Sequence, residues 1–458
     1  MVARRVIRVC LVTGEYPPDE GGVADYTRCL AEALAAAGAV VDVVTTRRGA
    51  GSPAAATSTM RGDAEKDNDD NVPTAAGRRV AVHRVVPSWR WPALMQLRQV
   101  VRTLAPDIVH IQYQTAAYGM HPAINAAPRW LRRFTPAKTA VTYHDLNVPY
   151  LFPKAGRVRT WVNLLPARHS HLTVVTNAAD HAALAAWGRA WELALVPIGS
   201  NIVDQPPAGY DRCVFRRAHG LRDDAAVLLY FGFLNASKGG RDLVDVLATL
   251  RAEGRDAMLI MLGGRTGASD PTNAAYLARF EADIAARGLA EAVRWTGHVA
   301  PPDVSAWLHA ADVAVLPYAD GASYRRGSLL AALTHGVPTV TTRPAGDVAG
   351  GDERPVIDGD VDLANDDDRQ RHRPAPLPRL VDGVAARLVP PGDADAMADA
   401  VRGILDDPAL ADRLRIGARA VAAHFGWAAI AAEHLRLYRD VLDRWTPPRK
   451  HDADEEQP

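Results

Sequence analysis

Two glycine-rich turns in the second half of the chain carry cations at positions suited to a bound phosphate. The turn at 232–239 contains Lys238, and the segment at 320–336 contains Arg325 and Arg326. Each follows an apolar run typical of a buried strand and precedes a helical pattern, so backbone N–H groups and a helix N-terminus would face an anion. Either turn alone is better explained as an ordinary loop with solvated basic residues. Together they predict a pocket for a phosphorylated ligand, such as a nucleoside diphosphate.

A third glycine-rich loop lies near the start of the chain. Gly21 and Gly22 directly precede a helical pattern, and glycine lets backbone amides approach a phosphate closely. The loop lacks the Gly-x-Gly-x-x-Gly spacing of dinucleotide-binding proteins, which argues against a nicotinamide-dependent dehydrogenase. The alternative is a loop that needs glycine only for its turn.

Apolar runs alternate with helical patterns along the first half of the chain. The run at 9–12 precedes a helical pattern between Val23 and Ala37 and a second run at 40–44, an order that predicts a parallel sheet. We expect residues 1–205 to form a Rossmann-like domain, with the Ala-, Gly- and Asp-rich segment 47–78 as a flexible insertion. Further strands are expected at 82–85, 108–111, 139–142, 173–175 and 193–196.

A second strand–helix series follows the Pro- and Gly-containing linker after Gln205. Residues 206–425 are expected to form a second Rossmann-like domain, with 346–382 as a flexible loop and 447–458 as a disordered tail. Doubly wound sheets bind ligands at the carboxyl ends of their strands, so a cleft between the two domains is the expected site. Strands are expected near 227 and at 258–262, 293–296, 313–316, 339–341 and 386–389, and closing helices at 394–405, 409–425 and 428–445.

Composition indicates an ordinary water-soluble protein of two domains. The chain has 458 residues, of which 48% are hydrophobic and 23% charged, and its 53 basic residues balance its 53 acidic ones. This balance argues against a general nucleic-acid binder. The cysteines, Cys10, Cys29 and Cys213, form no paired motif. The basic start is typical of a first strand rather than a secretory signal, and no apolar run approaches the ~18 residues of a membrane span, so we expect a cytoplasmic protein.

A series of short motifs, taken in order, resembles one known family over nearly the whole chain. The chain is similar to the family-four glycosyltransferases, which have the GT-B fold, use nucleotide-sugar donors and retain the anomeric configuration. The motifs are Glu15-Tyr-Pro-Pro…Gly21-Gly22-Val-Ala-Asp-Tyr-Thr, Thr142-Tyr-His-Asp-Leu, Val196-Pro-Ile-Gly, Gly232…Lys238-Gly, Gly297-His, Ala311-Asp-Val, Leu388-Val-Pro-Pro-Gly-Asp and Phe425-Gly-Trp427.

The resemblance implies roles for individual residues. Gly21 and Gly22 would approach the donor diphosphate, as would Gly232. His144 would lie near the donor sugar and the reacting centre, and Lys238 would pair with the diphosphate. Positive side chains would stabilise the departing oxygens where a metal ion would otherwise be needed, so no metal is expected. The resemblance also implies that residues 426–446 form a helix that returns to the first domain.

The chain departs from the family pattern at the donor site. Phe233 stands where the family commonly has an arginine, and the positions of its paired glutamates hold Ser323 and Ala331, which predicts a variant subgroup. The sugar-binding carboxylate would be missing or supplied by Asp320. We expect Arg325 or Arg326 to replace the lost cation, with Gly327 and Ser328 opening the helix behind them. The alternative is a surface arginine pair, which would oppose the helix dipole unless an anion were bound.

Acceptor and metal sites are less clearly marked. His110 and Gln112 end a predicted strand and, with Tyr16, could shape an acceptor site; a packed strand end is the alternative. Asp358, Asp360 and 366–368 have metal-like spacing but lie in a low-complexity loop, and His169 and His171 lack nearby ligand partners, so both groups are interpreted as structural or solvated.

The prediction is therefore a metal-independent hexosyltransferase-like enzyme without a cofactor, using a UDP- or GDP-linked sugar. Its acceptor would be a glycan, a lipid carrier or a small metabolite. Basic–aromatic segments at 129–134 and 157–161 raise the hypothesis of peripheral contact with the inner face of the membrane, against the alternative of solvated helix faces. Two other functions stay open: a sugar-nucleotide-binding protein that has lost catalysis with its glutamates, and another GT-B enzyme such as a sugar-nucleotide epimerase or a phosphorylase.

Overall fold

The chain divides into two compact units. The computed structural model describes residues 5–19, 21–47, 69–73, 79–146, 156–188, 190, 192–265, 271–344 and 377–445. The N-terminal unit comprises the described residues up to Ile198 and those from Trp427 onward, and the C-terminal unit comprises those from Gly199 to Gly426. The division after Ile198 lies seven residues before the boundary expected at 205.

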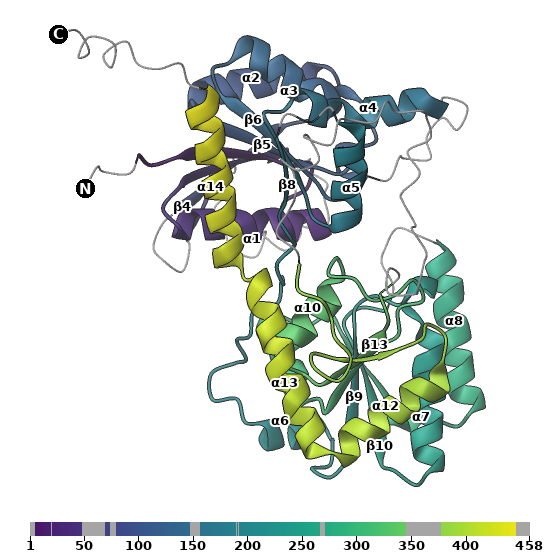
Figure 1. Cartoon of the computed structure of the whole chain (residues 1–458). Coiled ribbons are helices and arrows are strands. Elements are labelled where there is room, and N and C mark those ends of the chain that lie inside the picture. Colours follow the sequence, from purple (N-terminus) through teal and green to yellow (C-terminus); the bar gives the residue numbers. More distant parts are fainter. Residues whose placement is uncertain are drawn as a thin grey trace, which may run out of the picture. The chain divides into compact units, whose positions relative to one another are not determined.

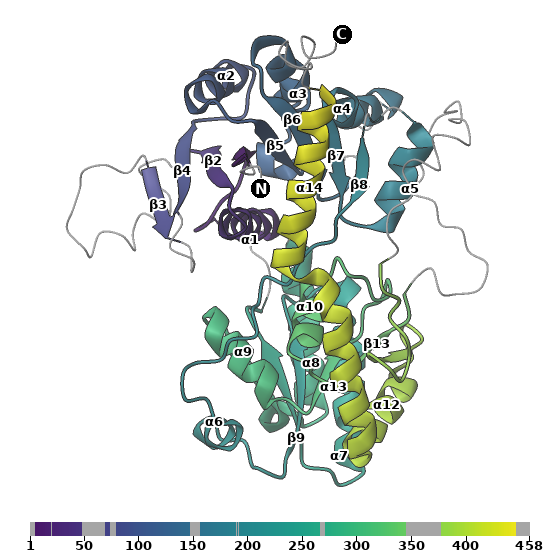
Figure 2. The ribbon, with the colours of Figure 1, turned by 60° about the vertical axis from the view of Figure 1, so that its left-hand side comes forward.

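The N-terminal unit is built on one sheet whose strands run parallel, apart from an antiparallel edge strand (Figures 1 and 2). In the part of the chain that is described, the strand order is β3-β4-β2-β1-β5-β6-β7-β8. β1 and β5 are buried along almost their whole length, as expected for strands covered on both faces, although β5 carries the polar His110 and Gln112. The strands are β1 (Arg8–Val12), β2 (Val40–Thr46), β3 (Asp69–Pro73), β4 (Arg79–Val86), β5 (Ile108–Tyr113), β6 (Lys138–Tyr143), β7 (Leu172–Val175) and β8 (Leu193–Leu195).

Helices cover both faces of this sheet. The helices of this unit are α1 (Gly22–Ala36), α2 (Pro92–Leu104), α3 (Ala123–Phe134), α4 (Gly156–His169), α5 (Ala178–Trp187) and α14 (Trp427–Trp445), with a 3-10 turn η2 (Ala116–Tyr118). Their apolar stripes and the sheet form two buried clusters, one on each side of the strands. The predicted Rossmann-like layering of the first half is thereby confirmed.

The C-terminal unit repeats this architecture with a six-stranded parallel sheet in its described residues. The strand order is β11-β10-β9-β12-β13-β14. The strands are β9 (Ala226–Phe231), β10 (Ala257–Leu262), β11 (Val293–Gly297), β12 (Val313–Leu316), β13 (Thr339–Thr342) and β14 (Arg387–Val389). The helices are α6 (Arg212–Ala218), α7 (Gly240–Ala252), α8 (Pro271–Ala286), α9 (Pro301–Ala310), α10 (Gly327–Thr334), α12 (Ala394–Asp406) and α13 (Pro408–Ala422), with 3-10 turns η4 (Ala236–Lys238), η5 (Ala290–Ala292) and η7 (Ala423–Phe425).

The last helix, α14, belongs to the N-terminal unit, as predicted. It packs along α1, and both figures show the two helices side by side. Ile430 and Tyr438 of α14 share a core cluster with Leu30 and Leu34 of α1. The ring of Trp427, the first residue of α14, meets the ring of Tyr26 edge to face at 5.3 Å between centroids. The C-terminal end of the chain therefore completes the core of the first unit.

The expected insertion at 47–78 is wrong in part, because residues 69–73 form the edge strand β3. This strand pairs with β4 through backbone hydrogen bonds, which need no apolar pattern. Residues 48–68 and 74–78, most of the expected loop at 346–382 with its Asp358, Asp360 and 366–368, and the tail at 447–458 lie outside the described residues.

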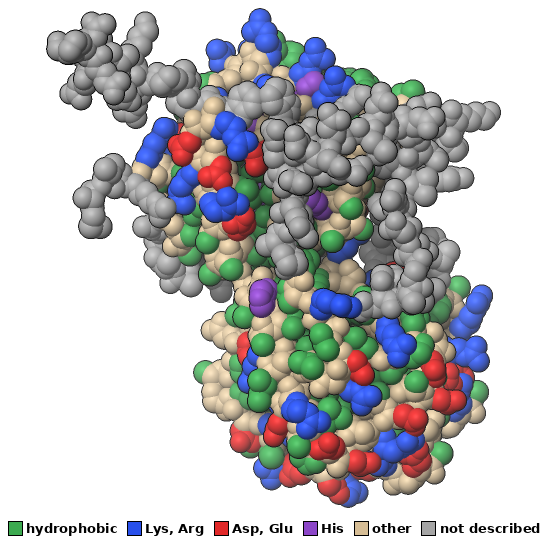
Figure 3. Space-filling model, in the orientation of Figure 1, with side chains coloured by type: hydrophobic (Ala, Val, Ile, Leu, Met, Phe, Trp, Pro, Cys, Tyr) green, Lys and Arg blue, Asp and Glu red, His purple; other side chains and the backbone are tan. Residues whose placement is uncertain are grey.

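No helix among the described residues is long and apolar enough to cross a membrane. The ring of Phe134, in the first basic–aromatic segment, has the guanidinium groups of Arg98 from α2 and of Arg133 at 5.7 and 5.4 Å from its centroid. Trp161 of the second segment is 53% exposed. Figure 3 shows basic and acidic side chains interleaved on the visible face rather than one extended basic surface. Peripheral membrane contact stays a prediction.

Candidate active site

Lys238 lies directly over the glycine that ends β9. A Cβ atom added to Gly232, whose φ is +116°, would stand 2.9 Å from Nζ of Lys238. Gly239 also has a positive φ, and a Cβ there would stand 1.9 Å from the carbonyl oxygen of Pro317. Only glycine permits this approach, which holds the turn after β9 against the end of β12. The ammonium group is thus fixed at the carboxyl ends of two neighbouring strands.

Arg326 reaches the same place from the N-terminus of α10. Its guanidinium carbon lies 5.0 Å from the ring centroid of Tyr318, just after β12, and it forms an ion pair with the carboxylate of Asp320. The hydroxyl of Tyr318 hydrogen-bonds to Oγ of Ser328 at 2.8 Å, which fixes the ring under the guanidinium. The arginine side chain is 21% exposed and that of Asp320 is 59% exposed.

The two cations act on each other. The pKa of Lys238 is lowered to about 8, chiefly because burial disfavours the ammonium and secondarily because Arg326 repels it. Within the described residues, no carboxylate forms an ion pair with Lys238. A bound anion would relieve both effects, since it would replace lost hydration and separate the two positive charges. The arrangement therefore favours a phosphate or diphosphate.

The remaining residues predicted at this turn are placed differently. Arg325 is exposed, and its backbone N–H donates to Oγ of Ser323 at 3.3 Å. Ser328 is buried and its hydroxyl is engaged by Tyr318, so it supports Tyr318 rather than offering a free hydroxyl. A Cβ at Gly327 would meet nothing within 4 Å, so this glycine leaves open space at the start of α10. Of the two arginines, the structure brings Arg326 to Lys238.

In the N-terminal unit, His144 is held at the end of β6 by neighbours on both sides. Its backbone N–H donates to the carbonyl of Tyr113 at 3.0 Å, and Nε2 lies 3.2 Å from Oε1 of Gln112. The ring of Tyr26 meets the imidazole edge to face at 4.7 Å. Gln112 is fully buried, and its amide nitrogen has no hydrogen-bond partner among the described residues. Gln112 therefore helps to orient the imidazole of His144, and its predicted part in an acceptor site stays a prediction.

His110 is buried in the core of the N-terminal unit, and its predicted part in an acceptor site stays a prediction. It is fully buried, with Nδ1 2.6 Å from the hydroxyl of Tyr438 and Nε2 2.8 Å from Oγ1 of Thr142. Burial holds the pKa of His110 well below its usual range, so the ring is neutral. Tyr16 is only 4% exposed and lies 6.0 Å from the guanidinium of Arg84, so little of its surface is open to a ligand.

The glycine pair at the start of α1 accommodates a carboxylate. A Cβ at Gly21 would stand 2.6 Å from Oε2 of Glu15, whereas a Cβ at Gly22 would meet nothing within 4 Å. Burial, with the nearby charge of Asp19, raises the pKa of Glu15. An anion approaching Gly21 would meet this carboxyl group, so its protonation bears on any diphosphate contact at the loop. The donor-binding roles of Gly21 and Gly22 stay predictions.

Both halves of the chain match known protein families. Residues 21–199 match the "Glycosyl transferase 4-like domain" and residues 225–365 match "Glycosyl transferases group 1". The chain is 27% identical to the D-inositol 3-phosphate glycosyltransferase of Arthrobacter sp. (strain FB24), over 93% of this chain and 92% of the relative. It is also 27% identical to a glycogen synthase of Mycobacterium tuberculosis (strain H37Rv), over 94% of each.

Solved structures agree on the fold. The sucrose-phosphate synthase of Thermosynechococcus elongatus superimposes with a TM-score of 0.64 at 23% identity, covering 96% of this chain and all of that one. The Anabaena protein HepE, in complex with UDP and glucose, superimposes with a TM-score of 0.63 at 16% identity, covering 95% of this chain and all of that one.

The chain is a glycosyltransferase of family four. Its two Rossmann-like units are those of the GT-B fold, and the transferase predicted from its motifs is confirmed.

Several residues of the glycosyltransferase site gave no signal in the sequence. Tyr318 under Arg326 looks like any apolar residue after a strand, and Gln112 was interpreted by its strand position alone. Glu15 lay within a recognised motif, yet its approach to Gly21 depends on the path of the loop. The interpretation of His169 and His171 as structural stays a prediction; Nδ1 of His171 accepts the backbone N–H of Thr139 at 3.0 Å.

Proposed function

We propose that this glycosyltransferase transfers a sugar from a nucleoside-diphosphate sugar to an acceptor, with retention at the anomeric carbon and without a metal ion. The observation that carries the proposal is the position of Lys238 beside Arg326, two cations of which, among the described residues, only Arg326 has a carboxylate partner, Asp320. As the glycosidic bond to the donor breaks, negative charge develops on the departing diphosphate. Fixed cations stabilise that charge without reorganisation.

The two cations have complementary roles. Lys238 is a compact point charge at a glycine turn, suited to the oxygen that bridges sugar and phosphate. Arg326, steadied by Tyr318, presents a planar fork that matches two oxygens of a phosphate. Without a ligand, Asp320 holds Arg326 in place through their ion pair. On binding, the diphosphate would replace Asp320 as the partner of Arg326. Because two side-chain cations supply the stabilisation, a divalent ion is not required for this step.

His144 and its supports form the N-terminal contribution to the reaction. We place His144 at the donor sugar. There its imidazole would hydrogen-bond to a sugar hydroxyl and stabilise the positive charge that develops on the sugar ring. Gln112 and Tyr26 fix the orientation of the imidazole, so it does not have to reorient as the transition state forms. Of the UDP- and GDP-linked donors expected, HepE supports the UDP-linked one, since its structure contains UDP and glucose. The names of two relatives support a polyol phosphate or a glycan as acceptor class.

The first test is ligand binding. Calorimetric titration of the protein with UDP, GDP, ADP and inorganic phosphate should show a preference for one nucleoside diphosphate, and the Lys238→Met variant should lose it. Hydrolysis or transfer from the matching nucleotide sugar, lost in His144→Ala, then establishes catalysis. Binding without turnover would favour a degenerate sugar-nucleotide-binding protein. Binding of inorganic phosphate with phosphorolysis, or conversion of the donor to its epimer, would favour the other GT-B enzymes.

A further inference from the structure

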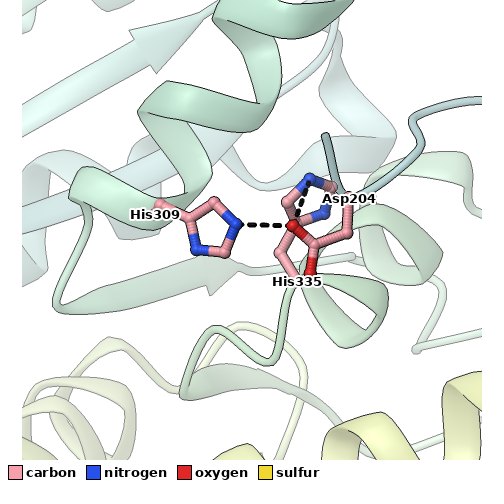
Figure 4. A group of neighbouring side chains, drawn as sticks. All are labelled: Asp204, His309 and His335. Carbon is pink, nitrogen blue, oxygen red and sulfur yellow. Dashed lines mark hydrogen bonds and ion pairs between the residues drawn. The ribbon is translucent and has the colours of Figure 1, made fainter. Parts of the chain in front are cut away.

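A cluster of two histidines and one aspartate lies in the C-terminal unit outside the proposed donor site. Asp204 lies in the segment that follows the start of this unit, His309 is near the end of α9, and His335 caps the C-terminus of α10. Figure 4 shows both imidazole rings directed at the carboxylate of Asp204. One ligand atom from each residue lies within 4.8 Å of the other two.

The inner histidine is fixed in the tautomer that a metal ion needs. Nδ1 of His335 lies 2.8 Å from the carbonyl oxygen of Ala331, which can only accept, so Nδ1 carries the proton. Nε2 therefore presents its lone pair to the cluster, where the hydroxyl of Ser305 donates to it at 2.9 Å. The His335 side chain has no exposed surface. Such a backbone hydrogen bond on the far nitrogen is the usual support of a metal-binding imidazole.

The outer two residues open the cluster to solvent. Nε2 of His309 lies 2.5 Å from Oδ1 of Asp204, and their side chains are 25% and 34% exposed. The same oxygen lies 4.0 Å from Nε2 of His335. An ion can therefore enter from the Asp204 side while His335 forms the floor of the site.

We propose that Asp204, His309 and His335 form a binding site for a zinc-class divalent ion. Two imidazole nitrogens and one carboxylate are a donor set that Zn²⁺, Co²⁺ and Ni²⁺ prefer over the oxygen-seeking Mg²⁺ and Ca²⁺. Metal–ligand bonds of about 2.0–2.1 Å place tetrahedral ligands roughly 3.3 Å apart. The observed separations of 2.5 and 4.0 Å bracket that value, so a small movement of the exposed Asp204 side chain suffices.

Binding at this site involves a simple proton balance. The ion takes the place of the proton on Nε2 of His309 that points at Asp204; in a neutral imidazole that proton moves to Nδ1, so both histidines bind as neutral rings and no proton is lost. The Ser305 hydroxyl gives up its acceptor on His335 and keeps the N–H of Gln205, which it accepts at 3.0 Å. A solvent molecule completes the coordination. The ion would tie the segment after the unit boundary to α9 and to α10, the helix whose first turn carries Arg326.

The test uses the full chain without a histidine tag, after removal of metals with a chelator. Titration with Co²⁺ should produce the visible absorption band of a tetrahedral complex and saturate at one ion per chain, and Zn²⁺ should abolish the band by competition. His309→Ala, at a half-buried position, and Asp204→Asn, at an exposed one, should each weaken Co²⁺ binding by at least about tenfold. Zn²⁺ should raise Tm in the parent protein but not in these variants.

The matched control is His424→Ala, which removes an exposed histidine from η7 in the same unit. It should bind Co²⁺ like the parent protein. Equal affinity in His309→Ala and the parent, a loss of binding in His424→Ala as large as in His309→Ala, or the absence of a tetrahedral band would each overturn the proposal. UDP binding is measured in the same samples, so failure of the metal site is distinguishable from failure of the donor site.

Discussion

Arg326 lies close enough to Lys238 to repel its ammonium group, although the two residues come from different turns of the C-terminal unit. Burial and this repulsion together lower the pKa of Lys238 to about 8. An anion bound beside both side chains would offset this repulsion, which makes the ionisation of Lys238 a reporter of donor binding.

The affinity for UDP should decrease at alkaline pH. Lys238 is charged below its pKa of about 8 and becomes neutral above it, whereas bound diphosphate raises that pKa. Binding above pH 8 must then take up a proton, so the association constant falls by up to about tenfold per pH unit. The phosphate of UDP titrates near pH 6 and does not contribute in this range. Calorimetry between pH 7 and 10 measures the slope.

The Lys238→Arg variant is the control for this pH dependence. Its guanidinium stays charged throughout the range, so any remaining UDP binding should lose the proton uptake of Lys238 and keep only the decrease that ionisation of the uracil N3–H causes at the alkaline end. A parent protein whose affinity stays constant from pH 7 to 10 would contradict the assignment of Lys238 to the diphosphate.

Arg326, and not Arg325, should contribute to donor binding. Arg326→Ala removes a charge-assisted contact worth about 1.5–3 kcal/mol, which corresponds to a roughly 10- to 150-fold weaker Kd for UDP. Arg325→Ala removes an exposed side chain and should change Kd by less than about threefold. Asp320→Asn frees Arg326 from its carboxylate partner and should strengthen UDP binding. The reverse order of the two arginine variants would show that α10 presents Arg325 to the ligand.

The layers of the fold could be predicted because buried parallel strands appear in a sequence as continuous apolar runs. Every strand expected from such a run is present, while β3 was missed because Asp69–Pro73 has no apolar pattern and pairs only through its backbone. The cationic turn at Lys238 could be predicted, because the glycines on either side of it constrain the path of the backbone and so the position of the side chain. Which of Arg325 and Arg326 approaches Lys238 depends on the residue at which α10 begins. The spacing of the motif residues in the sequence does not determine that residue.

The proposed metal site of Asp204, His309 and His335 could not be predicted from the sequence. Asp204 and His309 are separated by 105 residues, and neither lies in a motif. Their proximity to His335 results from the packing of α9 and α10 beside the segment that follows the unit boundary. His110 shows the converse: its strand-end position suggested function, but the return of α14 buries it against Tyr438.

Gly239→Ala should destabilise the C-terminal unit more than a typical glycine substitution. The new Cβ would meet the carbonyl oxygen of Pro317 at 1.9 Å and would also require a left-handed backbone at φ +66°. The backbone strain costs about 1–2 kcal/mol and the displaced strand end about 1–3 kcal/mol more. Gly254→Ala is the matched control, since its φ is +82° but its Cβ would enter open space, so only the strain remains. Thermal unfolding should rank the midpoints parent, Gly254→Ala, Gly239→Ala; equal midpoints for the two variants would refute the close approach.

Gln112 should affect turnover only through His144. Gln112→Met keeps the volume of the side chain but removes the oxygen that lies 3.2 Å from Nε2 of His144. The imidazole then loses its orientation, so kcat should fall by about 10-fold or more while Kd for UDP stays constant, since the proposed diphosphate contacts come from other residues. A double-mutant cycle with His144→Ala decides whether the two act as one unit. If Gln112→Met lowers kcat no further in the His144→Ala background, Gln112 is a positioning residue. Additive losses would instead mean that Gln112 acts on the reaction independently, and a fall in Tm equal to that of a core truncation would mean that its contribution is to folding.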